Sequence, residues 1–283
     1  MKIGTTDIVN CKIGSVQVNE IRIGSTLVWQ FSSLDPDAQA FVTAAGITNP
    51  TQQTAINNLV LSLKANSIWA KMKAIYPMVG GSATSHKFNL KNPLDTNAAF
   101  RLSFVGGWTH SANGALPNGT NAYANSFLIP SAQLSLNSTH ISYYSRTTGA
   151  VGNCFGAANV GLTNRTLWQF GGATNYISIY TSPGNYFFYT GATSLSMLTA
   201  NRTASNLMNA WQGNVKKATS TNASVALTTV AIYFGGNNAN GTPDTYSNAQ
   251  CAFASVGDGL TDTDATNFYT AVQAFQTTLG RQV

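Results

Sequence analysis

Carboxylate side chains, which could act as catalytic acids and bases, are scarce in this sequence. The 283 residues include nine acidic side chains, and Glu20 is the single glutamate among them. Asp35, Asp262 and Asp264 stand where helices are expected to begin, which gives them a structural role at the positive end of a helix. Cleavage of a glycosidic bond needs a pair of carboxylates, one acting as acid and one as base or nucleophile. We therefore predict that the protein is not an enzyme.

Other catalytic and metal-binding patterns are also missing. No Gly-x-Ser-x-Gly motif marks a nucleophile, and neither Gly106-Gly107 nor Gly171-Gly172 is followed by the lysine and helix of a phosphate-binding loop. The histidines and cysteines lack the spacing of a metal site; they are His86, His110, His140, Cys11, Cys154 and Cys251. We predict buried cysteines, no cofactor and no metal, with one Ca2+ held by Asp244 or Asp258 and backbone carbonyls as the alternative.

A binding surface remains, and one pair of loops combines the residue types that hold sugars. Flat aromatic rings stack on the C–H faces of a sugar, while amides and backbone groups bind its hydroxyls. The segments 107–113 and 118–123 carry these types together, and the candidate ligand-binding residues are Trp108, His110, Asn113, Asn118, Asn121 and Tyr123. In the alternative interpretation, the same residues form turns and anchor the core.

The composition and charge argue against nucleic acids and membranes as partners. Only 8% of the residues are charged, so the polar surface must consist of Ser, Thr, Asn, Gln and Gly. The net charge is +6, and no basic cluster is longer than Lys216-Lys217, which argues against a nucleic-acid site. No secretory signal is apparent and no run is long enough to span a membrane. We expect synthesis in a cytoplasm and no membrane insertion.

The elements that must position these residues are mainly short strands. Between residues 84 and 255, roughly a dozen apolar stretches alternate with Gly, Asn and Pro, a rhythm typical of an all-β sandwich. In the stretch Tyr186-Phe187-Phe188-Tyr189 the alternation fails, so we expect both faces of that strand to be covered. Helical segments are predicted within 35–76, with Asp35 and Asn49 as N-caps, and over 261–279, with Thr261 as N-cap and Gly280 after the end.

Residues 3 to 31 contain a repeat of ten, in which Ile-Gly-Thr or Ile-Gly-Ser recurs at Ile3, Ile13 and Ile23. An eight-residue strand plus a two-residue turn has this period, so residues 1–31 are predicted to form a three-stranded β-meander. Its register would place Ile13 opposite Val16 and Ile21 opposite Val28. One face would then be apolar and would have to dock or oligomerise; its residues are Val9, Ile13, Val16, Val18, Leu27, Trp29 and Phe31.

Residues 35–283 resemble the concanavalin A-like lectin/glucanase (LamG-like) domain of bacteriophage virion and tail proteins. The resemblance is carried by 87–90 (KFNL), 100–102 (FRL), 106–110 (GGWTH), 117–121 (PNGTN) and 279–281 (LGR). It implies an antiparallel jelly-roll sandwich with a few flanking helices. The first thirty residues are similar to short Ile-Gly-Ser-Thr-x-Val repeats at the starts of phage virion proteins. The Glu-x-Asp-x-x-Glu motif of laminarinase-like relatives is absent, consistent with the lack of paired acids.

From these patterns we expect two domains: a docking or oligomerisation module over 1–31 and a concanavalin A-like sandwich over 32–283. The hypothesis is a virion protein of the neck, tail fibre or capsid surface, released by lysis, that binds glycans of bacterial surfaces or mucus. Its expected partners are other virion proteins and further copies of itself. A structural decoration protein without glycan binding is the alternative, and a polysaccharide-processing enzyme is a third.

Overall fold

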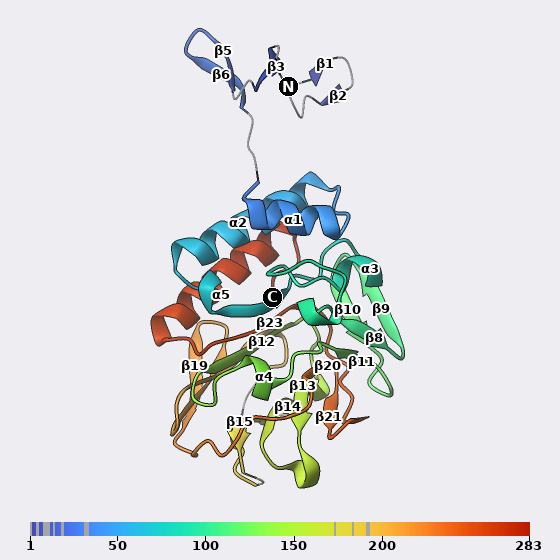
Figure 1. Ribbon diagram of the computed structural model, residues 1–283, viewed down its shortest axis with the longest axis vertical. Coiled ribbons are helices and arrows are strands. Elements are labelled where there is room, and N and C mark those ends of the chain that lie inside the picture. The colour runs from blue at the N-terminus through green and yellow to red at the C-terminus, as the bar shows by residue number, and fades with distance from the viewer. Residues whose placement is uncertain are drawn as a thin grey trace. The chain divides into compact units, whose positions relative to one another are not determined.

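The computed structural model describes residues 2–3, 6–7, 12–13, 15–17, 20–30, 34–172, 174–182, 184–190 and 193–283. It divides the chain into two compact units, Met1–Asp35 and Pro36–Val283 (Figure 1).

The first unit consists of hairpins. Its strands pair as β1 (Lys2–Ile3) with β2 (Thr6–Asp7), β3 (Lys12–Ile13) with β4 (Val16–Gln17), and β5 (Glu20–Ile23) with β6 (Thr26–Gln30). The prediction of one three-stranded meander is therefore wrong for the described residues. The pairs Ile13↔Val16 and Ile23↔Thr26 close two of these hairpins at the predicted turn positions, but the described strands do not join into one sheet.

The register of the hairpins tests the predicted pairs. Ile13 lies opposite Val16, as predicted. Ile21 lies opposite Trp29 rather than Val28, because a register shift between Ile21 and Arg22 adds one residue to the β6 side. Among the predicted docking residues, Val9, Val18 and Phe31 lie outside the described residues, whereas Ile13, Val16, Leu27 and Trp29 lie on β3, β4 and β6. The docking role of this segment stays a prediction.

The second unit is an antiparallel β-sandwich, which confirms the predicted all-β class. In its first sheet the order is β19-β18-β17-β12-β23-β10-β9, and β7 pairs with β23 beside β10. The bounds are β7 (Met72–Tyr76), β9 (Trp108–Ser111), β10 (Gly114–Pro117), β12 (Thr139–Ser145), β17 (Ser196–Ala204), β18 (Leu207–Gln212), β19 (Val215–Ser220) and β23 (Cys251–Gly257).

The second sheet has the order β16-β15-β14-β13-β20-β11-β8, with the small hairpin β21-β22 attached through β13. The bounds are β8 (Ser103–Val105), β11 (Tyr123–Asn125), β13 (Val151–Ala158), β14 (Arg165–Gly171), β15 (Thr174–Thr181), β16 (Phe187–Thr190), β20 (Tyr233–Phe234), β21 (Asn237–Ala239) and β22 (Thr242–Asp244). The pairing of β21 with β13 is parallel. Within the apolar stretch 225–234, the structure forms only β20, at its end.

The core lies between the inner faces of the two sheets. The first sheet contributes Ile141 and Tyr143, and the second contributes Trp168, Phe170 and Ile177. Side chains alternate along each strand, so the neighbours of these residues point away from the core. Cys154 and Cys251 are free thiols buried in this core, as predicted, while Cys11 lies outside the described residues.

Helices cover the outer face of the first sheet. They are α1 (Pro36–Ala44), α2 (Pro50–Ala65) and α5 (Asp262–Thr278), which Figure 1 shows packed together on one side of the sandwich. Tyr144 of β12 donates to Gln273 of α5 at 2.8 Å, and the rings of Phe253 and Phe268 lie 5.9 Å apart. The caps agree with the sequence: Asn49 accepts from the amide of Gln52, and Thr261 forms a capping box with Asp264.

Two further helices are one turn long, α3 (Ala83–His86) and α4 (Pro130–Gln133). Residues 72–76, predicted to be part of the N-terminal helical segment, instead form strand β7. Its burial pattern is nearly continuous, and it pairs with β23 from Tyr76↔Ala254 to Met72↔Gly257. A tertiary partner thus overrides the helical spacing of Ile68, Met72 and Ile75.

The C-terminus is fixed by a buried arginine. The Arg281 guanidinium donates to the carbonyls of Met78 (2.7 Å), Pro77 (2.7 Å), Ala252 (2.8 Å) and Ala112 (3.1 Å). Burial, and secondarily the charge of Arg146, lowers the pKa of Arg281 to about 9. Four carbonyl acceptors therefore hold this cation between strands that are distant in the sequence.

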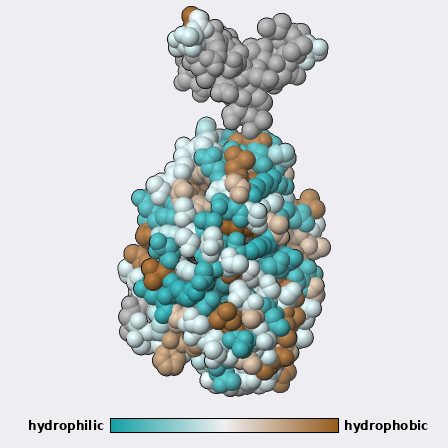
Figure 2. Space-filling view, turned by 90° about the vertical axis from the view of Figure 1, so that its left-hand side faces the viewer, coloured by the Kyte–Doolittle hydropathy of each residue, from teal (hydrophilic) through white to brown (hydrophobic). Residues whose placement is uncertain are grey.

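Among the described residues, no helix is long and apolar enough to span a membrane. Figure 2 shows one side of the protein, where separate hydrophobic patches are set among hydrophilic and neutral residues.

Candidate functional site

The six predicted binding residues lie along one edge of the sandwich, formed by β8 to β11. Trp108 begins β9, and its indole Nε1 donates to the carbonyls of Val105 (3.1 Å) and Tyr123 (3.2 Å). A Cβ on Gly235 would come within 2.8 Å of the Trp108 ring, so the glycine gives this ring room to pack inward. The indole N–H is therefore already bonded within the protein.

The amides of Asn118 and Asn121 serve the loop that carries them. Asn118 Oδ1 accepts from the backbone amides of Thr120, Asn121 and Ala122, and its Nδ2 donates to Asn121 Oδ1 at 2.8 Å. Asn121 Oδ1 also accepts from the amide of Gly107. This is the turn-forming role that polar loop residues commonly have.

Two further residues of this set, Tyr123 and Asn113, differ in their surroundings. Tyr123 stacks on Tyr233 with ring centroids 4.6 Å apart, and Asn113 is exposed at the tip of the β9–β10 hairpin. Sugar binding by this edge stays a prediction. Several of its hydrogen-bonding groups, those of Trp108, Asn118 and Asn121, are already bonded within the protein.

His86 and His110 form a pair that their spacing in the sequence did not suggest. His86 ends α3, His110 lies on β9, and their Nδ1 atoms are 2.9 Å apart. Burial, followed by the charges of His110 and Arg281, lowers the pKa of His86 to about 3. One nitrogen therefore donates to the other in a neutral pair. Nothing in a single sequence indicates that α3 packs beside β9, so the pair could not be predicted.

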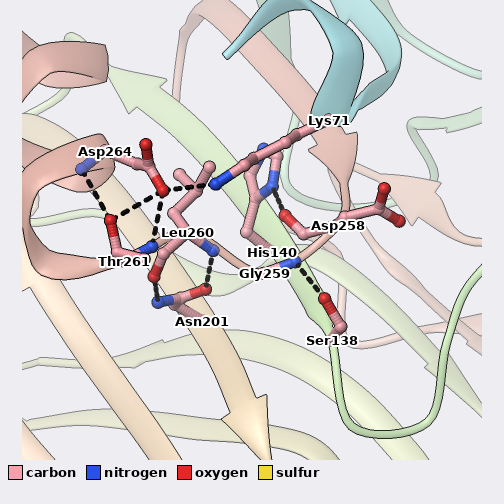
Figure 3. Close-up of polar contacts among 9 residues, drawn as sticks. All are labelled: Lys71, Ser138, His140, Asn201, Asp258, Gly259, Leu260, Thr261 and Asp264. Carbon is pink, nitrogen blue, oxygen red and sulfur yellow. Dashed lines mark hydrogen bonds and ion pairs between the residues drawn. The ribbon is translucent and has the colours of Figure 1, made fainter. Parts of the chain in front are cut away.

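A third polar cluster surrounds the start of α5 (Figure 3). The carbonyl of Asp258 can only accept, so Nδ1 of His140 donates to it, at 2.6 Å, and Nε2 accepts from Ser255 at 3.2 Å. A serine bonded to a histidine can be a nucleophile and its base. His140 and Ser255 are completely buried, however, so a substrate cannot reach them.

The rest of that cluster secures the loop before α5. Asn201 exchanges two hydrogen bonds with the backbone of Leu260, and the amide of Gly259 donates to Ser138. Lys71 pairs with Asp264 at 2.5 Å. In Figure 3, Asn201 reaches the loop from β17, Ser138 from the loop before β12, and Lys71 from the turn before β7, while Asp264 belongs to the start of α5. We interpret the cluster as structural.

In the described part of the chain, no three His, Cys, Asp or Glu side chains form a group that could hold a metal ion. Asp258, one of two aspartates considered for a cation, lies 3.8 Å from the ammonium of Lys73.

The most exposed aromatic group lies on the outer face of the second sheet. Asn153, Gln169, Tyr176 and Phe188 are direct neighbours across β13, β14, β15 and β16, and form one row across the sheet. Their neighbours Trp168, Ile177 and Phe187 point into the core, so this row points outward. Phe188 is 61% exposed and Tyr176 is 36% exposed.

Tyr186 completes this group, which we call the aromatic face: Tyr176, Tyr186 and Phe188. The Tyr176 ring centroid lies 6.1 Å from that of Tyr186 and 6.3 Å from that of Phe188. The guanidinium of Arg165 lies over the Tyr186 ring at 4.5 Å, a cation–π contact. A Cβ on Gly171 would come within 2.7 Å of the Tyr176 ring, so the ring lies close to β14.

The aromatic face was not predicted from the sequence. The stretch Tyr186-Phe187-Phe188-Tyr189 was expected to be covered on both faces, but Phe187 and Tyr189 are buried while Phe188 is exposed. The prediction was wrong because four consecutive aromatic residues conceal the alternation of a strand that has one open face. Aromatic residues at every second position, Tyr186 and Phe188, were the available signal.

No family model and no curated protein sequence matches this chain. Among solved structures, it is similar to domain 4 of AbnA, a GH43 extracellular arabinanase from Geobacillus stearothermophilus, in complex with arabinotriose. The identity is 14% and the TM-score 0.46, over 70% of this chain and 98% of that one. The botulinum neurotoxin serotype D binding domain has 9% identity and a TM-score of 0.48, over 72% of this chain and 53% of that one. The NanB sialidase from Streptococcus pneumoniae has 9% identity and a TM-score of 0.40, over 58% of this chain and 27% of that one.

This chain thus spans about half of the matched toxin chain and about a quarter of the matched sialidase chain. The similarity is one of β-sandwich fold.

Proposed function

We propose that this protein binds carbohydrate on the aromatic face and does not cleave it. The observation that carries this function is the group of neighbouring aromatic rings on an open sheet surface, with Phe188 61% exposed. An aromatic ring exposed on a rigid sheet offers a flat apolar surface to the C–H face of a sugar ring. Side chains on strands are held more firmly than side chains on loops, which favours ligand binding at low entropic cost.

Polar groups beside the rings suit the hydroxyls of such a ligand. Gln169 lies next to Tyr176 across β14 and β15, and its side chain is partly exposed. Thr174 and Thr190 are opposite each other on β15 and β16, two residue pairs beyond the row and therefore on the same face of the sheet. An amide and two hydroxyls next to these neighbouring rings provide donors and acceptors at the rim of an apolar surface.

We further propose a bacteriophage virion as the setting, with residues 1–31 attaching the sandwich to other virion proteins or to further copies of this chain. The repeat of ten residues, the sparsely charged composition and the resemblance of the sequence support this setting. The sandwich would then act in adhesion to bacterial surfaces or mucus.

Binding of the full chain to an array of bacterial polysaccharides, plant glucans and arabinans, and mucin glycans tests the proposed function. For the tightest binder on the array, Phe188→Ala and Tyr176→Ala are each expected to weaken binding about tenfold, because each removes a stacking surface. Both side chains are exposed, so the folded state should tolerate the changes.

Leu94→Ala is the matched control, because Leu94 is 60% exposed and lies outside the sheet. Its affinity should equal that of the unchanged protein. Loss of binding in Tyr123→Ala but not in Phe188→Ala would move the site to the β8–β11 edge. No binding to any array component would contradict carbohydrate binding and favour a structural decoration role.

A further inference from the structure

A second cluster of oxygen atoms lies on the same outer face, where the segment 235–247 folds over β13. A Cβ on Gly156 would come within 2.6 Å of Asn237 Oδ1, so the Asn237 side chain covers the place where a side chain of β13 would point outward. The amide of Asn153 donates to the carbonyl of Thr245 at 2.9 Å, so residues 244–246 run beside β13 at this point. The segment therefore encloses the outward positions of Asn153 and Gly156.

Two amide oxygens inside this enclosure have no hydrogen-bond donor. Asn153 and Asn237 are 2% and 4% exposed, and in the described part of the chain the Oδ1 atom of each is buried without a partner. The orientation of the Asn237 amide is fixed, because its Nδ2 donates to Asp244 Oδ1 at 2.9 Å and a carboxylate only accepts. Both acceptors belong to the contact between β13 and the segment 235–247, and a buried acceptor without a donor needs an explanation, of which a bound ion is one.

Asp244 adds a negative charge to the cluster. Its Oδ1 accepts from Asn237 and from the hydroxyl of Thr245. The other aspartates of residues 36–283 each lie within 4.0 Å of a lysine or arginine: Asp37, Asp95, Asp258, Asp262 and Asp264. Among the described residues, Asp244 has no such ion pair. Its carboxylate is thus available to a bound cation.

We propose that Asn153 Oδ1, Asn237 Oδ1 and the Asp244 carboxylate bind one calcium ion. Calcium takes six to eight oxygen ligands, including amide and backbone carbonyls, carboxylates and water, and tolerates irregular geometry. Magnesium demands a near-ideal octahedron and keeps several waters, so it fits an irregular set of protein oxygens less well. With a single carboxylate, the expected Kd is about 10⁻⁴ to 10⁻³ M.

The ion would join two parts of the outer face. Asn153 belongs to the row that includes Tyr176, and neighbouring strands are about 4.8 Å apart, which puts the aromatic face roughly 10 Å away across the sheet. The ion would fasten the β21–β22 hairpin to β13 at that end of the row. This site does not depend on the proposed carbohydrate binding, since its ligands are separate residues.

Calorimetric titration of the EDTA-treated full chain with CaCl2 tests the proposal. We expect one saturable site, Mg2+ binding at least about tenfold weaker, and an unfolding temperature about 3–6 °C higher in 10 mM CaCl2 than in EDTA. Asp244→Asn keeps the shape and the acceptor oxygen but removes the charge, so it should weaken calcium binding at least about tenfold.

Asp262→Asn is the matched control, because Asp262 pairs with Lys216 at the start of α5 and should leave calcium binding unchanged. Asn153→Asp adds a second carboxylate and should enlarge the calcium-dependent rise in unfolding temperature. Absence of a saturable calcium signal would overturn the proposal, because water would then satisfy the two amides. Unchanged affinity in Asp244→Asn would overturn it as well.

Discussion

Two histidines of the sandwich are kept neutral by their surroundings. His86 is 1% exposed beside His110, and His140 is completely buried between β12 and α5. Burial lowers the pKa of His140 to about 4, although its bond to the carbonyl of Asp258 acts in the opposite direction. An unfolded chain exposes both rings to water, where their pKa returns to about 6.5.

The fold should therefore lose stability in acid below pH 6.5. Above that pH both states hold the rings neutral, and below it only the unfolded state gains protons until the pH reaches the folded pKa values near 3 and 4. At pH 4.5 each histidine should lower the free energy of unfolding by about 2.5 kcal/mol relative to pH 7. Urea denaturation at both pH values measures this loss.

His140→Gln serves as the comparison, because it removes one titrating ring and leaves His86 in place. Its loss of stability between pH 7 and pH 4.5 should be about half that of the unchanged chain. An identical pH dependence in the two proteins would mean that His140 does not contribute.

At the scale of secondary structure, the start of α5 combines several local signals. Thr261 accepts from the amide of Asp264 at 3.2 Å, and Asp264 Oδ2 accepts from the amide of Thr261 at 2.9 Å. The same carboxylate pairs with Lys71, which joins the helix start to the segment before β7. A local cap and a tertiary contact thus share one side chain.

Thr261→Ala should destabilise the protein by about 1 kcal/mol, because it leaves the Asp264 amide without its capping acceptor. Thermal denaturation measures the change as a lower unfolding temperature. Thr266→Ala is the control with the same chemical change: Thr266 is exposed within α5, where alanine is the better helix former. Equal losses in both variants would contradict a capping role for Thr261.

At the scale of the whole molecule, the chain contains two units of unequal size. The core lies within Pro36–Val283, and the described strands of the first unit pair as two-stranded hairpins, which are marginal alone in water. The sandwich should therefore fold without residues 1–33, and the first unit should gain stability from a partner.

Removing residues 1–33 should leave the unfolding temperature of the sandwich unchanged. It should also lower the molecular mass of the protein in solution from that of an oligomer to that of a monomer. Thermal denaturation and light scattering after size exclusion measure the two quantities. A fragment that fails to fold would show that the first unit stabilises the sandwich. A full chain that is itself monomeric would contradict self-assembly and leave other virion proteins as the expected partners.

The sequence by itself determined the features that depend on neighbouring residues. Turn glycines and alternating apolar residues predicted the sandwich, and the caps at Asn49 and Thr261 predicted the starts of α2 and α5. The pairing of Ile13 with Val16 followed from a two-residue turn. Such features follow from backbone geometry within a few residues, so a single sequence is enough to predict them.

Only the tertiary structure decided which surfaces are open and which distant groups meet. Met72 to Tyr76 became a strand because β23 lies beside it, and His86 met His110 because α3 packs against β9. Phe188 is exposed because helices cover the first sheet and leave the outer face of the second partly uncovered. Exposure and long-range contact depend on the packing of whole elements, which the spacing of residues along a strand does not specify.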